Sequence, residues 1–138
     1  VAARGLEERV TLEAGDAETA VAAAGSVDVV TVAFGVRNFG DLGRGLAELS
    51  RALRPGGRIV ILEFSTPTMP DWYSHRVLPR IGGWLSHDRQ AYDYLPRSVD
   101  EFPQPEEFLT ILAAAGFRDC RARSQSFGIA QIYTAEKC

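Results

Sequence analysis

The chain lacks the residues that usually mark a metal site or a nucleic-acid surface. Its two cysteines, Cys120 and Cys138, share no CxxC spacing and have no histidine nearby in the sequence, so we expect no metal site. Cys120 fits a packed strand position. Lys137 is the only lysine, and the net charge is -3. Because a general nucleic-acid binder usually presents a basic face, we expect no nucleic-acid partner.

The chain also lacks a long apolar run and a signal peptide. No run approaches the ~20 residues that a membrane-spanning helix needs, so the compartment we expect is the cytoplasm. Hydrophobic residues nevertheless make up 46% of the 138 residues, which is enough to build a core. This length allows one domain at most.

The amino-terminal end has an unusual start for a domain. The first residue is Val1, not methionine, and Gly5 follows what resembles the end of a helix. The short strand that we predict at Val10–Ala14 comes almost at once. Natural domains seldom begin in this way, so we expect residues 1–138 to be part of a longer protein.

The most informative stretch runs from Val27 to Ser65. Val27–Ala33 and Arg58–Phe64 are apolar, β-branched runs, which fits strands buried on both faces. Between them, leucines recur at helical spacing and form one apolar stripe. Asp41 is the expected N-cap of this helix, and Pro55-Gly56-Gly57 its end. The alternation predicts a parallel sheet with right-handed crossovers.

The remaining segments predict further elements of the same α/β class. Ala17–Ala24 is rich in alanine and is expected to be helical. Pro105 starts a second helix, which Gly116 closes. Arg118–Ser124 and Ile129–Ala135 are predicted as two final strands joined in a hairpin.

Polar or small residues follow the predicted strands, where an open α/β sheet places its ligands. Asp16 and Ala17 follow the first strand, and an acidic side chain there can accept a hydrogen bond from an adenine amino group. Read alone, Asp16 fits a turn or a helix cap. Arg37 and Asn38 follow the second strand, and the alternative for Arg37 is a surface ion pair. Glu63 would either orient a substrate or cap a neighbouring helix.

The wording FGVRN followed by LRPGGRIVILEFS resembles the C-methyltransferases that complete ubiquinone and menaquinone. This resemblance implies the Rossmann-like fold of class I S-adenosylmethionine-dependent methyltransferases, an α/β fold whose sheet is mostly parallel with a carboxyl-terminal antiparallel strand. The family's amino-terminal strands are missing from this sequence. The strand predicted at Val10–Ala14 would lose both its neighbours, so we expect it to be frayed, detached or abnormally paired. Residues 1–138 would then be a partial methyltransferase domain, with residues 66–103, rich in proline and aromatic residues, as an insert on the substrate side.

The resemblance implies S-adenosyl-L-methionine as the cofactor. It carries contacts with the adenine ring over to Asp16, Ala17 and Ala33. Relatives often have serine at the position of Ala33, so only its backbone could serve here. The glycine-rich turn that cradles the cofactor is absent, and so is the acidic residue that holds its ribose. We therefore expect the isolated chain to bind the cofactor weakly or not at all, and to be inactive.

The mechanism expected from the resemblance is methyl transfer to an electron-rich carbon of a quinol ring. A phenol has a pKa near ~10, and a neighbouring guanidinium favours its ionised form. Arg37 suits that role, with Asn38 orienting the hydroxyl. Arg37 itself stays protonated, so the proton would pass to water, to His87 or to Asp88.

The expected substrate is a polyprenylated quinol, either demethylmenaquinol or 2-methoxy-6-polyprenyl-1,4-benzoquinol. The segment DRQAYDYLPRSV resembles the part of the family that closes over the quinol, which assigns Tyr92 and Tyr94 to substrate binding. The alternatives are a methyltransferase for another small molecule, or a non-catalytic α/β fragment that binds a partner chain. Met69–Leu85 suits peripheral contact with the inner face of a membrane, and equally a helix packed over the sheet. The oligomeric state is open, and a homodimer is compatible with the sequence.

Overall fold

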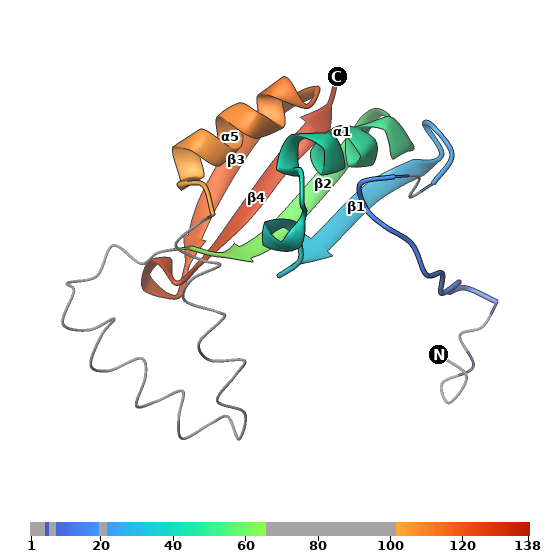
Figure 1. Ribbon diagram of the computed structural model, residues 1–138, viewed down its shortest axis with the longest axis horizontal. Coiled ribbons are helices and arrows are strands. Elements are labelled where there is room, and N and C mark those ends of the chain that lie inside the picture. The colour runs from blue at the N-terminus through green and yellow to red at the C-terminus, as the bar shows by residue number, and fades with distance from the viewer. Residues whose placement is uncertain (1–4, 6–7, 20–21, 66–101) are drawn as a thin grey trace.

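The fold is an α/β arrangement of two layers (Figure 1). The computed structural model describes residue 5 and residues 8–19, 22–65 and 102–138. In this part of the chain, a four-stranded sheet in the order β1-β2-β4-β3 carries helices α1 and α5 on one face. The strands are β1 (Val27–Ala33), β2 (Leu53–Phe64), β3 (Phe117–Gln125) and β4 (Ala130–Lys137), and the helices are α1 (Leu42–Ala52) and α5 (Pro105–Ala114).

The sheet is mixed. β1 and β2 are parallel neighbours, with Val30 opposite Ile59 and Ala33 opposite Leu62. β4 pairs antiparallel with β2, and β3 pairs antiparallel with β4. Three strands therefore run in one direction and β4 runs against them. This confirms the predicted parallel pair and the two final strands added beside it, one of them antiparallel.

The two helices begin where the sequence predicts. The carboxylate of Asp41 accepts a hydrogen bond from the Arg44 N–H at 2.9 Å, which makes it the N-cap of α1. α5 has Pro105 as its first residue, where a missing N–H costs no hydrogen bond. Gly116 follows α5 with a positive φ of 92°, the backbone conformation that most often ends a helix.

The core lies between the sheet and the helices. Along β2, Ile59, Ile61 and Glu63 are fully buried, and the intervening residues are less so, because successive side chains of a strand point to opposite faces. The prediction that β1 and β2 are buried on both faces is therefore wrong: β1 has no buried residue and Val29 is 55% exposed, because the described helices cover only one face of the sheet. Phe108 of α5 meets the Tyr133 ring of β4 edge-on at 4.6 Å. The other buried core side chains are Val36, Leu46, Leu49, Leu53, Phe102, Leu112, Phe117 and Ala135.

β2 begins earlier than predicted, at Leu53 instead of Arg58. The pairing with β1 shifts register between Val27 and Val29, so Pro55-Gly56-Gly57 forms an irregular stretch near the start of β2. α1 ends at Ala52, before this stretch. The turn that we expected to end the helix therefore starts the strand instead.

Near the amino terminus, the strand predicted at residues 10–14 is not formed, as expected for a strand without its neighbours, and the predicted helix 17–24 is wrong. Residues 10–14 form no strand, and their apolar side chains Val10 and Leu12 are 40% and 78% exposed. A strand needs a neighbour for its N–H and C=O groups, and none of the described strands lies beside this segment. Of the predicted helix 17–24, residues 17–19 and 22–25 form turns and bends, and residues 20 and 21 lie outside the described part.

Candidate functional site

A buried ion pair between Arg37 and Glu63 lies at the carboxyl-terminal ends of β1 and β2. Arg37 belongs to a short 3-10 helix, Val36–Asn38, that follows β1, and Glu63 is the penultimate residue of β2. The guanidinium Nη1 donates to one carboxylate oxygen of Glu63. The two side chains are only 9% and 0% exposed. The alternative prediction for Arg37 was a surface ion pair. Arg37 does form an ion pair, but this pair is buried.

Backbone groups complete the environment of the Glu63 carboxylate. The Phe64 N–H donates to one oxygen at 2.9 Å, and the Arg37 N–H approaches the other at 3.4 Å. Charge-assisted hydrogen bonds of this kind are stronger than neutral ones. With its oxygens engaged in this way, Glu63 is poorly placed to accept a proton from a substrate.

Two stacked phenylalanine rings lie beside the ion pair. The rings of Phe34 and Phe64 are 4.4 Å apart at their centroids, and the guanidinium carbon of Arg37 lies 5.4 Å from the Phe64 ring. Phe34 has a positive φ of 55°, which is rare for an aromatic residue. Its N–H donates to the Leu62 carbonyl at 2.8 Å, so the chain stays bound to β2 as it turns. Strained backbone held in place by neighbours is common at functional sites.

Two buried polar atoms have no hydrogen-bond partner among the described residues. They are Nε of Arg37 and the hydroxyl oxygen of Tyr133. Burial, and then the negative charge of Glu63, raises the pKa of Tyr133 to about 12. The phenol is therefore a neutral group near neutral pH, with a donor that the described part of the chain leaves unused.

The predicted cofactor residue Asp16 lies in an exposed turn. Its carboxylate accepts a hydrogen bond from the Glu18 N–H at 2.9 Å, and its carbonyl accepts one from the Thr19 N–H at 3.1 Å. This is the turn geometry that the residue type favours. The carboxylate remains at the surface, where it can accept a further hydrogen bond.

Glu18 ties this turn to the segment that follows β1. Its carboxylate accepts hydrogen bonds from the backbone N–H groups of Gly40 and Asp41, the second at 3.1 Å. An anion is favourable here because Gly40 and Asp41 directly precede α1, and the amino-terminal end of a helix carries a partial positive charge. Asp16 and Ala17 are thereby held near the carboxyl-terminal side of β1 although no strand precedes them.

The other described site residues lie at the same end of β1. Ala33 is its last residue and is exposed, and Asn38 ends the 3-10 helix with its N–H donating to the Gly35 carbonyl at 3.1 Å. The fold thus places Ala33, Arg37 and Asn38 on one short stretch at the sheet edge. His87, Asp88, Tyr92 and Tyr94, the segment Met69–Leu85 and nearly all of the predicted insert lie outside the described residues.

Two contacts were not predicted from the sequence: the clamp of Glu18 on the Gly40 and Asp41 N–H groups, and the pairing of Glu63 with Arg37. A signal existed for the pair, because Glu63 is a lone acid in an apolar strand and a buried charge requires a partner. Arg37 follows the neighbouring strand and is the cation that a parallel pairing brings closest. No comparable signal existed for Glu18, since its partners are backbone groups of a distant loop.

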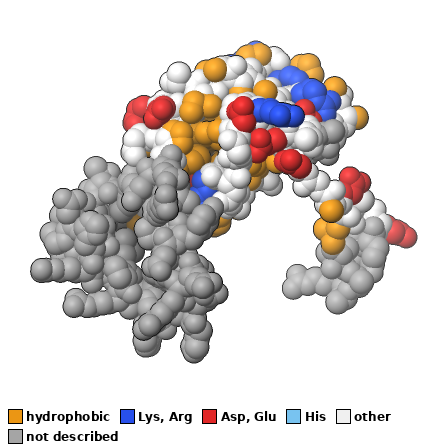
Figure 2. Space-filling model, in the orientation of Figure 1, with side chains coloured by type: hydrophobic (Ala, Val, Ile, Leu, Met, Phe, Trp, Pro, Cys, Tyr) orange, Lys and Arg blue, Asp and Glu red, His pale blue; other side chains and the backbone are white. Residues whose placement is uncertain are grey.

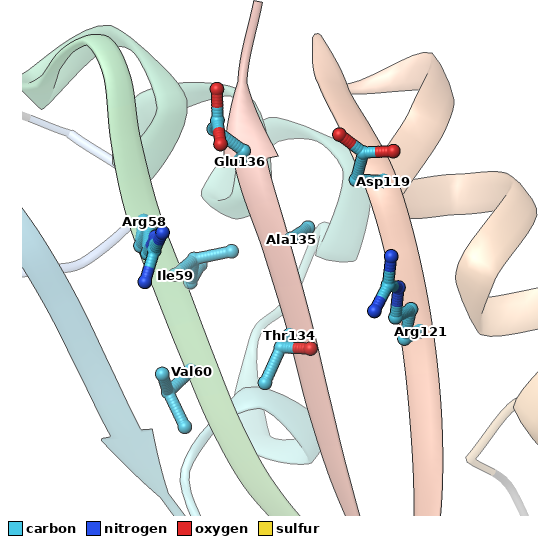
Figure 3. Close-up of a pocket in the computed structure, with 8 residues that line it drawn as sticks. All are labelled: Arg58, Ile59, Val60, Asp119, Arg121, Thr134, Ala135 and Glu136. Carbon is cyan, nitrogen blue, oxygen red and sulfur yellow. The ribbon is translucent and has the colours of Figure 1, made fainter.

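A separate pocket of 400 Å³ lies toward the other end of the sheet (Figure 3). It is formed by the amino-terminal part of β2 together with β3 and β4, and in the close-up the helices lie behind the strands. Its charges are mixed, since Arg58 and Arg121 face Asp119 and Glu136. Ligands of open α/β sheets bind at the carboxyl ends of the strands, and none of the predicted site residues that the structure describes lines this pocket. We therefore do not assign the candidate site to it.

The surface of the described residues shows no strong separation of charge on the face drawn in Figure 2, where acidic and basic side chains lie next to one another. In the same part of the chain, no group of three or more His, Cys, Asp or Glu residues is arranged to hold a metal ion. None of the described helices is both long enough and apolar enough to cross a membrane.

Comparisons with known proteins agree with the motifs around this site. The model of the ubiE/COQ5 methyltransferase family matches residues 2–137. The ubiquinone/menaquinone biosynthesis C-methyltransferase UbiE of Geobacter sulfurreducens is 50% identical over 135 residues, which cover 94% of this chain and 52% of that protein. The demethylmenaquinone methyltransferase of Thermus thermophilus is 46% identical over 141 residues, which cover 98% of this chain and 63% of that protein. The chain thus spans about half the length of the curated relatives it matches.

The fold agrees with solved methyltransferases. A SAM-dependent methyltransferase from Aquifex aeolicus superposes with a TM-score of 0.67 at 17% identity, over 100% of this chain and 60% of that structure. This likeness shows that the chain has part of a Rossmann-like methyltransferase fold. Since the family model covers nearly every residue, the chain belongs to the ubiE/COQ5 methyltransferase family.

Proposed function

We propose that this chain is the carboxyl-terminal part of an S-adenosylmethionine-dependent C-methyltransferase that methylates a polyprenylated quinol in menaquinone or ubiquinone biosynthesis. The observation that supports this most directly is the buried Arg37–Glu63 pair at the carboxyl edge of the sheet, inside the motifs that resemble the family. The names of the relatives point to the same reaction, because they are ubiquinone/menaquinone or demethylmenaquinone methyltransferases.

The described residues fit the adenine side of the cofactor. Asp16 offers an exposed carboxylate, Ala17 and Ala33 are small, and Glu18 holds the turn near the end of β1. A flat ring could lie against the small side chains while its amino group donates to Asp16. When bound, S-adenosylmethionine supplies an electrophilic methyl group. The carboxylate and ribose of the cofactor would contact residues that this sequence does not contain.

The chemistry requires an electron-rich ring carbon, which a quinol provides when one hydroxyl loses its proton. Arg37 would stabilise the phenolate oxygen, with Asn38 orienting the hydroxyl. Because Glu63 compensates the charge of Arg37, the stabilisation would come from well-placed N–H donors more than from net positive charge. The proton would pass to water, His87 or Asp88.

The insert at residues 66–103 would cover the substrate. Tyr92 and Tyr94 would line the quinol pocket, and excluding water there would strengthen the polar contacts of Arg37. Met69–Leu85 would allow the enzyme to take its polyprenyl substrate from the inner face of a membrane while remaining a cytoplasmic protein. A homodimer would be compatible with this arrangement.

The test uses the whole protein that carries this chain, with S-adenosylmethionine and each of the two quinols in turn. We expect a product heavier by one methylene unit in mass spectrometry. Arg37→Ala should lower kcat ~10²- to 10³-fold with little change in cofactor affinity. Arg37→Lys should restore only part of the rate, because a point charge does not reproduce the guanidinium fork.

The matched control is Arg54→Ala, which removes an arginine from an exposed ion pair with Asp28, 2.8 Å apart. We expect its kcat to equal that of the unaltered protein. Methylation of another small molecule but of neither quinol would favour the alternative substrate. No methylation at all, together with specific binding of a protein partner, would favour a non-catalytic role. Near-normal turnover in Arg37→Ala would remove Arg37 from the mechanism.

A further inference from the structure

We propose that Glu63 is a positioning residue, which holds the Arg37 guanidinium in the orientation that the reaction requires. This inference rests on the proposed function, since it assigns Glu63 a role through Arg37. Glu63 itself does not contact the reacting atoms, because its carboxylate oxygens are engaged by Arg37 and by the Phe64 N–H.

Three contacts hold Arg37 in place, two made by its side chain and one by its backbone. Nη1 is bound to the Glu63 carboxylate, the guanidinium lies over the Phe64 ring, and the backbone N–H of Arg37 approaches the second carboxylate oxygen. An arginine has several rotatable bonds, and holding it in one rotamer costs conformational entropy. Here contacts within the protein compensate this loss of entropy during folding, so the remaining N–H donors of Arg37 are oriented before a substrate binds.

The Nε atom of Arg37 supports this reading. It is buried and has no partner among the described residues. An unsatisfied buried donor is costly and usually has an explanation in function or in a missing partner. A phenolate or hydroxyl oxygen is the kind of acceptor that would satisfy it.

The burial of this pair distinguishes it from the other ion pairs of the described residues. Arg54–Asp28 has side chains 62% and 73% exposed, and the Arg118–Glu136 and Arg51–Glu48 pairs are also partly open to solvent. A buried pair often adds little stability compared with apolar side chains of the same size. Its location at the ligand edge of the sheet therefore favours a positioning role over a purely stabilising one.

The experiment compares Glu63→Asp with Glu63→Gln in the whole protein. Aspartate keeps the negative charge but is one methylene shorter, so the carboxylate withdraws from Nη1. We expect Glu63→Asp to fold and to lose ~10-fold to 10²-fold in kcat, because small misplacements of a reacting group are costly. The KM for the quinol and the affinity for the cofactor should change little. Glu63→Gln should be less stable, because it leaves a buried cation uncompensated.

A double variant separates positioning from stability. In the Arg37→Ala background, Glu63→Asp should cause no further loss of kcat, since the group it positions is gone. A Glu63 that only stabilises the fold would lower the rate again. Asp28→Asn is the matched control for removing an acid from an ion pair and should leave kcat unchanged.

The outcomes separate this inference from the proposed function. If the unaltered protein methylates neither quinol, the proposed function fails. If it does, and Arg37→Ala is slow while a folded Glu63→Asp is as fast as the unaltered protein, only the role of Glu63 is refuted. Circular dichroism on each variant, at the assay temperature, verifies that the rates belong to folded protein.

Discussion

At the scale of the residue, burial determines how Arg37 can act. An isolated guanidinium would favour a phenolate by charge, but the carboxylate of Glu63 cancels most of that charge inside the protein. The pair can still offer directed N–H donors, whose effect depends on orientation. Treating Arg37 as a simple positive charge is therefore incomplete. The orientation of its N–H donors becomes its important property.

The hydroxyl of Tyr133 gives a test of buried polarity. The group is buried, has no partner among the described residues, and its pKa is raised from 10 to about 12, first by burial and then by Glu63. We expect Tyr133→Phe to be as stable as the unaltered chain near neutral pH, or more stable by about 1 kcal/mol, because an unsatisfied hydroxyl is removed. Urea unfolding at neutral pH measures this.

The same variant should differ in alkaline solution. The pKa of Tyr133 is higher in the folded state than in the unfolded state, so the unfolded chain loses its proton first as the pH rises. The unaltered chain should lose stability between about pH 10 and pH 12, and the advantage of Tyr133→Phe should grow over that window. A variant that is clearly less stable at neutral pH would mean that the hydroxyl has a partner.

At the scale of the element, glycines determine how β2 enters the sheet. Gly56 has a positive φ of 73°. A Cβ on Gly57 would lie 2.8 Å from the Arg54 carbonyl oxygen and 3.1 Å from that of Asp28. Backbone atoms cannot move aside as a flexible side chain can. The Pro-Gly-Gly stretch is therefore a requirement of close packing between the start of β2 and β1.

We predict opposite effects for two glycine substitutions. Gly57→Ala should destabilise the chain by about 1–3 kcal/mol, because the new methyl group overlaps backbone atoms. Gly43→Ala is the matched control in α1, where the nearest atom to an added Cβ is a carboxylate oxygen of Asp41 at an ordinary 3.5 Å. It should stabilise the chain by up to about 1 kcal/mol, because alanine favours a helix. Thermal unfolding of both variants measures the difference, and equal effects would contradict the packing argument.

At the scale of the whole molecule, the described part of the chain forms one edge of a site. Its sheet ends at β1, which has β2 on one side and no strand on the other within the described residues. The turn of Asp16 is held by the contact of Glu18 with the Gly40 and Asp41 N–H groups, and the residues that we propose to contact the adenine ring lie at this open end. None of the described strands is followed by a glycine-rich turn of the kind that would cradle the cofactor's remaining groups.

We therefore predict that the chain of 138 residues binds S-adenosylmethionine weakly or not at all and does not methylate a quinol. Asp16, Ala17 and the end of β1 would contact little more than the adenine ring. Isothermal titration calorimetry on the chain by itself measures the affinity. A dissociation constant in the micromolar range would mean that these residues build a more complete pocket than the adenine side alone.

The sequence by itself determined the order of the main elements, their caps and the family. Apolar β-branched runs, one leucine stripe and the Asp41 cap are local signals, and local physics dictates their structures. It also indicated that Arg37 and Asn38 follow a strand, because the end of an apolar β-branched run can be seen in the pattern. The burial of that strand on both faces was predicted wrongly, since it depends on elements that would cover its second face. The strand predicted at residues 10–14 does not form in this chain, because a strand depends on neighbours for its N–H and C=O groups, and the lack of those neighbours was the reason to expect it frayed or detached.

Only the tertiary structure decided which distant residues meet. The parallel pairing of β1 with β2 brings Arg37 to Glu63, 26 positions apart in the sequence, and gives Arg37 a buried ion pair where the sequence offered a surface ion pair only as the alternative to a role in the site. The contact of Glu18 with the start of α1 likewise joins segments that no local rule connects. Burial and partner choice depend on the packing of the whole chain, and for that reason the geometry of the site could not be read from the residues alone.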